Sequence, residues 1–300
     1  MVPEKHLNLI PGLVRLVFHD CSGKNCDGCI NKTHPFNGRV VPVVEALEPL
    51  FNDKKGLGIC IKDIMSRADF WALGSIEATK IGIQLNNRRC RATGKKDCLT
   101  RPMKLPFRFG RKDCSSSPFY TRKETPALPP AFLDNKQTLD FFKINFGFNS
   151  KETTTIMGGH SLGFSGNNTR IPGTWEVGNA DGFGNQYFKN ILNKKLNWRQ
   201  VPNIGTDGSV RWRWVGDNDA FGLQTDINLV RDITVDPVTG FSSSYLCSPK
   251  SSTLKYVKKL TKPRIFAQSY AKTFIKMITL GPCNLMRPKF TWFSRISNVP

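Results

Sequence analysis

The stretch Arg15-Leu16-Val17-Phe18-His19-Asp20-Cys21 decides how this 300-residue chain is interpreted. It closes residues 8–20, in which Leu and Val recur at the spacing of a helix with one apolar face. Arg15 and His19 are four residues apart, so they share another face of that helix, beside Phe18. A base, a fixed cation and an apolar wall predict a small polar site in an apolar pocket. The simpler interpretation is a salt-bridged helix face.

A second stretch, Met157-Gly158-Gly159-His160-Ser161-Leu162-Gly163, ends a helix predicted over residues 151–163. Two glycines before His160 allow a flat or bulky group to approach the backbone. Neutral imidazole is the commonest metal ligand among side chains, so His160 is a candidate ligand. The alternative is a helix end that carries an incidental histidine.

A third stretch, Leu223-Gln224-Thr225-Asp226, precedes an amphipathic turn. A metal-bound histidine needs an acceptor for its other ring nitrogen, and a buried aspartate such as Asp226 is the usual one. Taken alone, Thr-Asp predicts only the start of a helix.

The rest of the chain has a mostly helical pattern with thin signs of strands. Hydrophobic periodicity predicts further helices over residues 39–51, 61–79, 136–146, 186–195, 226–232 and 262–280. We expect a short hairpin within residues 199–218. Residues 86–134 hold many Pro, Lys and Arg residues, which predicts irregular surface chain between two helical lobes.

The composition limits the class of protein. The chain has 44 Lys and Arg against 23 Asp and Glu, a net charge of +21, which indicates a nucleic acid, another polyanion or an anionic surface as partner. No run of 18 uncharged apolar residues is present, so no transmembrane helix is expected. Nine cysteines favour an oxidising compartment. The first residues are polar, so the chain does not open with a signal peptide. Because the cysteines favour secretion, we expect an extracellular protein whose signal peptide has been removed. The alternative is that the cysteines serve in a reducing compartment.

The three stretches occur in the order found in the plant, fungal and bacterial haem peroxidase superfamily, which this sequence resembles over about residues 9–281. Shorter matches are Ser66-Arg67-Ala68-Asp69-Phe70-Trp71-Ala72-Leu73, Phe109-Gly110-Arg111-Lys112-Asp113 and Leu128-Pro129-Pro130. The resemblance implies a mainly α fold of about ten helices with few short strands. Two helical lobes, a distal lobe of residues 1–130 and a proximal lobe of residues 131–300, would sandwich a haem.

The resemblance also implies catalytic roles in the first lobe. His19 resembles the distal histidine, which takes a proton from hydrogen peroxide and returns it to the leaving oxygen. Arg15 resembles the arginine that stabilises the developing charge, and Phe18 the aromatic residue beside them. The segment His34-Pro35-Phe36-Asn37-Gly38 resembles the one whose Asn, here Asn37, accepts the Nδ1 proton of the distal histidine.

In the second lobe, His160 resembles the proximal ligand of the haem iron. Asp226 resembles the carboxylate that accepts its Nδ1 proton and lowers the iron potential. Trp175 resembles the proximal tryptophan of the ascorbate and cytochrome c peroxidase branch, although the spacing is one residue short. A radical-bearing role and simple ring packing under the haem both stay open for Trp175.

The resemblance to the secreted branches implies cation sites. Asp20, Gly23, Asn25 and Asp27 match positions around a distal Ca²⁺ site, and oxygen ligands of this kind suit that ion. Cys29 stands where that site has a serine. Ser161 matches a ligand of a second, proximal cation, but the expected Asp before the Asn-x-Tyr-Phe segment is Gly184, and the nearby Asp181 is out of register.

The cysteines and sequons bear on the compartment. Cys21 and Cys26 match a family disulfide, Cys90 and Cys98 are close enough to close a short loop, and Cys247 is a candidate partner of Cys283. A zinc or redox site at Cys21, Cys26 and Cys29 is the alternative. The sequons Asn31-Lys32-Thr33 and Asn167-Asn168-Thr169 agree with a secreted glycoprotein.

The leading hypothesis is a secreted haem b peroxidase that responds to oxidative stress. It would reduce hydrogen peroxide and oxidise small aromatic or phenolic donors by one-electron steps. Ascorbate is another donor, but Arg170 does not match the spacing of the family's ascorbate-binding arginine.

The alternative function is a basic protein that binds an extracellular matrix or polyanion, with residues 86–123 as the basic segment and little or no activity. Nucleic acid is not expected, because no nucleic-acid module is present.

Relatives carry a helix before the first motif, and fourteen residues precede Arg15 here, so a truncated and a minimal N-terminus both stay open.

Overall fold

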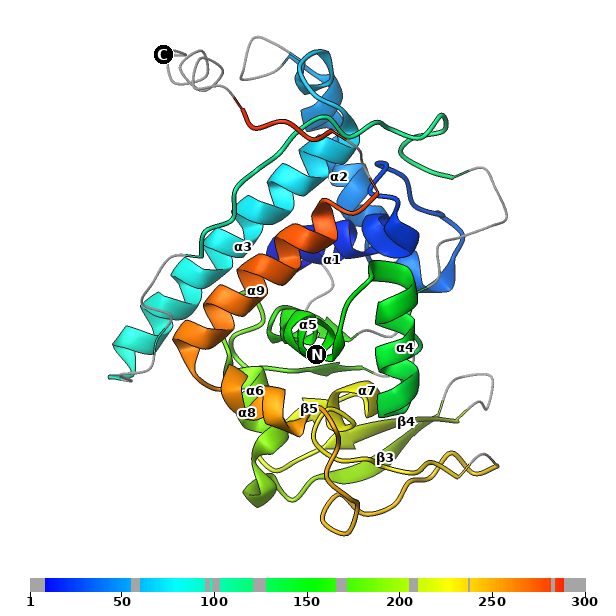
Figure 1. Cartoon of the computed structure of the whole chain (residues 1–300), viewed down its shortest axis with the longest axis vertical. Coiled ribbons are helices and arrows are strands. Elements are labelled where there is room, and N and C mark those ends of the chain that lie inside the picture. The colour runs from blue at the N-terminus through cyan, green and yellow to red at the C-terminus, as the bar shows by residue number, and fades with distance from the viewer. Residues whose placement is uncertain are drawn as a thin grey trace. The chain divides into compact units, whose positions relative to one another are not determined.

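The mainly α fold is confirmed. A computed structural model describes residues 9–54, 60–94, 98, 103–120, 128–165, 172–204, 210–236, 238–281 and 284–288. Within these ranges the chain forms nine α-helices and five short strands (Figure 1). It divides into two compact units, of which the first comprises Met1–Ala78, Leu105–Ala127 and Ile275–Pro300, and the second Thr79–Lys104 and Leu128–Phe274. Within the described ranges, no helix has the length and hydropathy needed to cross a bilayer.

The first unit is built on α1 (Leu9–Cys21), α2 (Val41–Asn52) and the first turns of α3 (Arg67–Ala92). Its apolar stripes meet in one core because each helix carries its aliphatic residues at helical spacing. The fully or nearly buried members of this core are Leu16, Ile30, Val40, Val43, Val44, Leu47 and Trp71.

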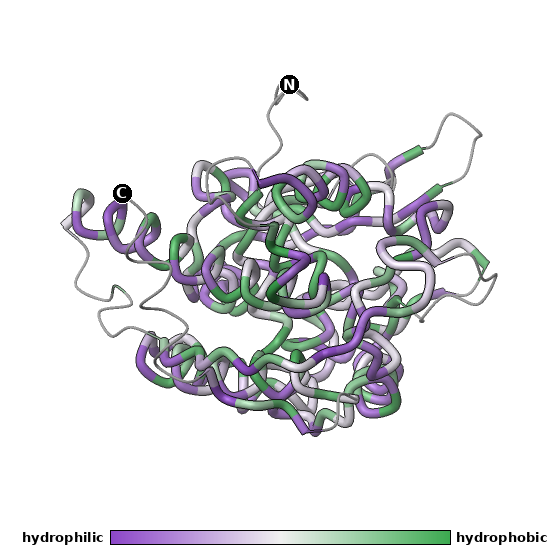
Figure 2. The backbone as a smooth tube through the Cα atoms, turned by 90° about the horizontal axis from the view of Figure 1, so that it is seen from above, coloured by the Kyte–Doolittle hydropathy of each residue, from purple (hydrophilic) through white to green (hydrophobic). Residues whose placement is uncertain are grey.

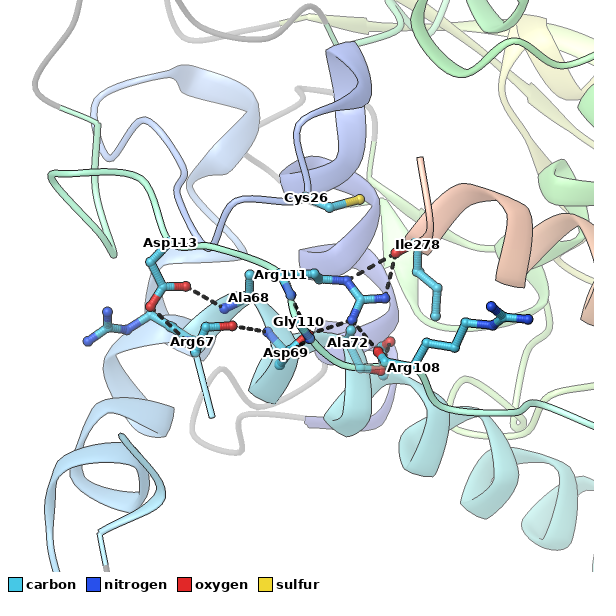
Figure 3. A network of polar contacts seen from close by, with 12 residues as sticks. Cys26, Arg67, Ala68, Asp69, Ala72, Arg108, Gly110, Arg111, Asp113 and Ile278 are labelled. Carbon is cyan, nitrogen blue, oxygen red and sulfur yellow. Dashed lines mark hydrogen bonds and ion pairs between the residues drawn. The ribbon is translucent and has the colours of Figure 1, made fainter. Parts of the chain in front are cut away.

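A buried polar network joins three segments of the first unit that are distant in sequence (Figure 3). The Arg111 guanidinium donates to Asp69 Oδ1 at 2.7 Å and to the Ile278 carbonyl at 2.6 and 3.1 Å. Asp113 accepts from the backbone nitrogens of Arg67 and Ala68, at 2.9 and 2.8 Å, and so caps the start of α3. These hydrogen bonds therefore hold the stretch Arg67-Ala68-Asp69 against the stretch Arg111-Lys112-Asp113.

The second unit contains the remaining turns of α3, most of α9 (Pro263–Ile278), and five shorter helices. These are α4 (Asn135–Phe146), α5 (Ser150–Ile156), α6 (Gln186–Leu192), α7 (Gln224–Ile227) and α8 (Leu254–Leu260). Capping boxes at Asp134 and Asn149 start α4 and α5, and Gly147, at φ +61°, ends α4. These local signals explain why both helices begin close to where the sequence predicts.

Aromatic rings fill the interior of the second unit. Phe188 of α6 and Phe266 of α9 pack with ring centroids 5.6 Å apart. A Cβ atom on Gly158 would lie only 2.6 Å from Phe266 and 2.8 Å from Phe188, so a glycine is needed for the backbone to lie on these rings. The flat groups that approach Gly158 are therefore side chains of the protein itself.

The strands of the second unit form two small antiparallel sheets. β3 (Arg199–Ile204) pairs with β4 (Val210–Val215), which pairs with β5 (Phe221–Gly222), so the expected hairpin is confirmed. β1 (Phe164–Ser165) pairs with β2 (Gly173–Thr174). Helix α7 lies against β4 and β5 (Figure 1), where Trp214 Nε1 donates to Gln224 Oε1 at 2.6 Å.

Several predicted helix boundaries were wrong. α3 begins at Arg67 rather than at residue 61, and it continues to Ala92, into the segment expected to be irregular. Hydrophobic and hydrophilic residues alternate along most helices in Figure 2, but residues 84–92 are polar on nearly every face, so periodicity carries no signal there. The helix predicted over 226–232 is the four-residue α7, and α5 ends at Ile156, before a 3₁₀ helix, Met157–Ser161. α8 was not predicted, because two buried apolar residues are too few to show a period.

Candidate functional site

The first constellation lies in the first unit and centres on His19. One face of α1 carries Arg15 and His19, and Arg15 Nε donates to His19 Nε2 at 3.2 Å. His19 Nδ1 lies 2.6 Å from Asn37 Oδ1. Because an amide oxygen only accepts, Nδ1 carries the proton and Nε2 presents its lone pair. Asn37 is held by its own bond from Nδ2 to the Asn31 carbonyl at 2.8 Å.

The electrostatics of this constellation suit proton transfer. Burial, reinforced by the charge of Arg15, lowers the pKa of His19 to about 3, so the imidazole is neutral at pH 7. Burial also lowers the pKa of Arg15 to about 10, which leaves its guanidinium charged. Phe18 meets His19 edge-on, with ring centroids 6.0 Å apart. A neutral base therefore lies beside a permanent cation.

The second constellation lies in the second unit and centres on His160. The 3₁₀ helix at the end of α5 places His160 Nδ1 2.7 Å from Asp226 Oδ1, and Asp226 is wholly buried in α7. Burial alone would raise the pKa of Asp226, but the interaction with His160 and the hydrogen bonds that the carboxylate accepts from His160, Trp175 and the Leu223 nitrogen lower it overall. Within the described ranges, His160 Nε2 has no hydrogen-bond partner, and 31 % of the His160 side chain is accessible.

Two aromatic residues complete this constellation. Trp175 stacks on His160 with ring centroids 4.2 Å apart and an interplanar angle of 19°, and its Nε1 donates to Asp226 Oδ2 at 2.7 Å. The Tyr187 hydroxyl donates to Asp226 Oδ1 at 2.8 Å. A role for Tyr187 was not predicted from the sequence. Tyr187 lies in the segment Asn185-Gln186-Tyr187-Phe188, which was considered only for the second cation site.

The donor set around His160 fits a haem iron. A neutral imidazole whose Nδ1 proton is held by a buried carboxylate is the usual form of a histidine ligand. Nε2 is the nitrogen left without a partner among the described residues.

The expected Ca²⁺ position contains two coupled carboxylates. Asp20 Oδ2 is buried without a hydrogen-bond partner in the described part of the chain, while Oδ1 accepts from the Cys29 nitrogen at 3.1 Å. Burial, together with the negative charge of Asp27, raises the pKa of Asp20 well above its usual value. Both Asp27 oxygens accept from the Tyr120 hydroxyl, to which the Asn25 amide donates, and Gly23 bends the loop at φ +71°. An orphaned oxygen beside a second carboxylate fits a hard cation.

The residues at the second cation position do not fit an ion. Ser161 Oγ is buried without a partner among the described residues. Asp181, the carboxylate nearest in sequence to the expected ligand, forms a bidentate ion pair with Arg89, which lowers the pKa of Asp181. No carboxylate among the described residues of that loop is left for a metal.

Three disulfides form among the described residues. Cys21–Cys26 and Cys90–Cys98 are present as expected, whereas Cys29–Cys114 was missed. Cys21, Cys26 and Cys29 are all paired in disulfides, so none of the three is left as a thiolate for zinc. Cys60 is a buried free thiol and Cys247 an exposed one. Cys283, Arg170 and the sequon at Asn167 lie outside the described residues.

Comparison with known proteins gives matches to peroxidases. The peroxidase family profile matches residues 2–240. A protein described as a heme-binding peroxidase from Debaryomyces hansenii is 28 % identical over 59 % of this chain and 36 % of its own length. Peroxidase 5 of Vitis vinifera is 27 % identical over 52 % of this chain and 43 % of its own length. The mitochondrial cytochrome c peroxidase of Candida albicans is 25 % identical over 90 % of this chain and 63 % of its own length. The chain thus spans less than two thirds of the length of these relatives.

Proposed function

Because this chain belongs to the peroxidase family, we propose that it binds haem b through His160 and reduces hydrogen peroxide while oxidising small donors. The observation that carries this proposal is the 2.7 Å contact between His160 Nδ1 and the buried Asp226, with Nε2 unpaired among the described residues. When bound, haem supplies a redox-active iron and the electrons that reduce peroxide to water.

The residues around His160 hold a proton at a defined atom. Asp226 keeps the Nδ1 proton between itself and the ring, so Nε2 is the nitrogen free to bind a metal. Trp175 stacks on the ring and holds the other carboxylate oxygen, which prevents the Asp226 carboxylate from rotating.

The residues around His19 move a proton. His19 Nε2 accepts a proton from hydrogen peroxide and returns it to the leaving oxygen, so that water departs. Arg15, held 3.2 Å from that nitrogen, stabilises the negative charge that develops on the oxygen. Asn37 keeps the proton on Nδ1 and so maintains the base in its competent tautomer.

Reconstitution with haem tests the proposed function. The purified chain should take up haem, show a high-spin ferric Soret band and oxidise guaiacol when peroxide is added. A chain that takes up no haem contradicts the proposal. For the donor, we favour phenols, and guaiacol should be consumed faster than ascorbate under the same conditions. The reverse order favours ascorbate.

Calcium and secretion are further parts of the proposal. Asp20 and Asp27, with backbone oxygens of Gly23 and Asn25, would hold one Ca²⁺. The orphaned Asp20 Oδ2 supports this site. Three disulfides support an oxidising, extracellular compartment, and the turn at Asn31 supports glycosylation there.

The second candidate function is binding to an anionic matrix or another polyanion. Residues 237–300 contain eleven Lys and Arg and no Asp or Glu. Six of these basic side chains are exposed on or beside α8 and α9, namely Lys255, Lys258, Lys259, Lys262, Arg264 and Lys272. Such a field attracts polyanions at low salt. The chain should be retained on heparin at low salt; no retention there, or retention that is unchanged by neutralising these residues, contradicts this function.

A further inference from the structure

Tyr187 shares a single oxygen of Asp226 with His160. Its hydroxyl lies 2.8 Å from Oδ1, and His160 Nδ1 lies 2.7 Å from the same atom. Oδ2 accepts from Trp175 Nε1 and from the backbone nitrogen of Leu223, both at 2.7 Å. An ionised carboxylate offers about four acceptor positions, so these four donors use all of them.

The position of Tyr187 is fixed at both ends of the residue. Its ring is 1 % exposed and meets the His160 ring edge-on, with centroids 6.0 Å apart and an interplanar angle of 84°. Its backbone nitrogen donates to Glu176 Oε1 at 3.0 Å, and Glu176 directly follows Trp175 in the chain. The hydroxyl therefore cannot leave Asp226 without disturbing the packing around it.

Two donors on one oxygen weaken each other. Each hydrogen bond withdraws negative charge from Oδ1, so the Nδ1 proton of His160 is drawn less strongly towards Asp226 than it would be alone. The imidazole then keeps less anionic character and donates less electron density through Nε2.

We propose that Tyr187 is a positioning residue that limits the electron donation of His160 to the haem iron by sharing Asp226 Oδ1. This inference rests on the proposed function, in which His160 binds that iron. Loss of the hydroxyl should strengthen the His160–Asp226 hydrogen bond, favour ferric iron and lower the ferric/ferrous potential.

Tyr187→Phe removes the hydroxyl and keeps the ring. A matched control is Tyr245→Phe, because Tyr245 is also buried in the second unit but donates to the Ile191 carbonyl, at 2.8 Å. In the full chain without haem, NMR should show the His160 Nδ1 proton further downfield in Tyr187→Phe only. In the haem-loaded chain, the iron–histidine vibration should rise in frequency. The reduction equilibrium should shift by about threefold to tenfold, the upper end being about 59 mV for one electron.

The outcomes separate the two proposals. An unmoved Nδ1 proton, or a haem-loaded Tyr187→Phe variant whose potential matches that of Tyr245→Phe, overturns the role of Tyr187 and leaves the proposed function standing. A chain that takes up no haem overturns the proposed function, while the proton shift still decides whether Tyr187 and His160 share the oxygen.

Discussion

Asn37 Oδ1 lies 2.6 Å from His19 Nδ1, and this contact decides which nitrogen of His19 carries the proton. The tautomer that results leaves Nε2 as an acceptor beside the Arg15 guanidinium. In the same way, Asp226 decides the tautomer of His160. In each histidine, the contact of Nδ1 with one side-chain oxygen thus determines which ring nitrogen carries the proton.

Asn37→Val should slow the reaction with peroxide by about tenfold or more, because the Nδ1 proton loses its acceptor and Nε2 becomes a poorer base. Stopped-flow absorbance of the haem-loaded variant measures this rate. The haem content should stay unchanged, since Asn37 belongs to the other constellation. An unaltered rate would show that the contact has no catalytic part.

His160→Ala and His19→Ala should fail in different ways. His160→Ala removes the nitrogen that we assign to the iron, so haem affinity should fall by at least tenfold. His19→Ala should keep haem but lose about a hundredfold or more in the rate of peroxide cleavage. Haem titration and stopped-flow kinetics measure the two effects. Equal haem loss in both variants would refute this division of labour.

Through His19, the protein should lose stability as the pH is lowered from about 6.5 towards 3. His19 has a pKa of about 3 when folded against 6.5 for the free side chain, so in this window the unfolded chain binds a proton that the folded chain does not. The loss is at most about 1.4 kcal/mol per pH unit for one group. Urea unfolding at pH 4.5, 5.5 and 7 should show a weaker pH dependence for His19→Gln, and an identical dependence would count against this cause.

Asp20→Asn should weaken Ca²⁺ binding by at least tenfold, because it removes one of the two carboxylates of the proposed site. Calorimetric titration with Ca²⁺ or luminescence of bound Tb³⁺ measures the affinity. Asp140→Asn is the matched control, since Asp140 pairs with Lys136 on the surface of α4. Failure of the wild-type chain to bind either ion would remove the site.

Cys29→Ser should lower the free energy of unfolding by about 2–4 kcal/mol, because the disulfide to Cys114 closes a loop with a sequence separation of 85 residues. Cys247→Ser is the control, since Cys247 is an exposed free thiol and should change little. Denaturant unfolding under non-reducing conditions compares the two. Equal stability of both variants would show that the crosslink contributes nothing.

The motifs that place Arg15, His19 and His160 could be predicted because each depends on neighbours a few residues away. The helical period alone puts Arg15 and His19 on one face, and the structure shows them in contact. Helix ends were less predictable. α3 extends to Ala92 through polar residues, and such a segment has no apolar stripe from which its limits could be inferred.

The sequence by itself determined the helical class of the fold and the shared face of Arg15 and His19, since both depend on short-range spacing along the chain. Only the tertiary structure decided that Tyr187 and Trp175, 39 and 51 residues before Asp226, share its carboxylate with His160. It also decided that Cys29 pairs with Cys114. Contacts between residues so far apart depend on how the helices and loops pack, and no local pattern in the sequence records that packing.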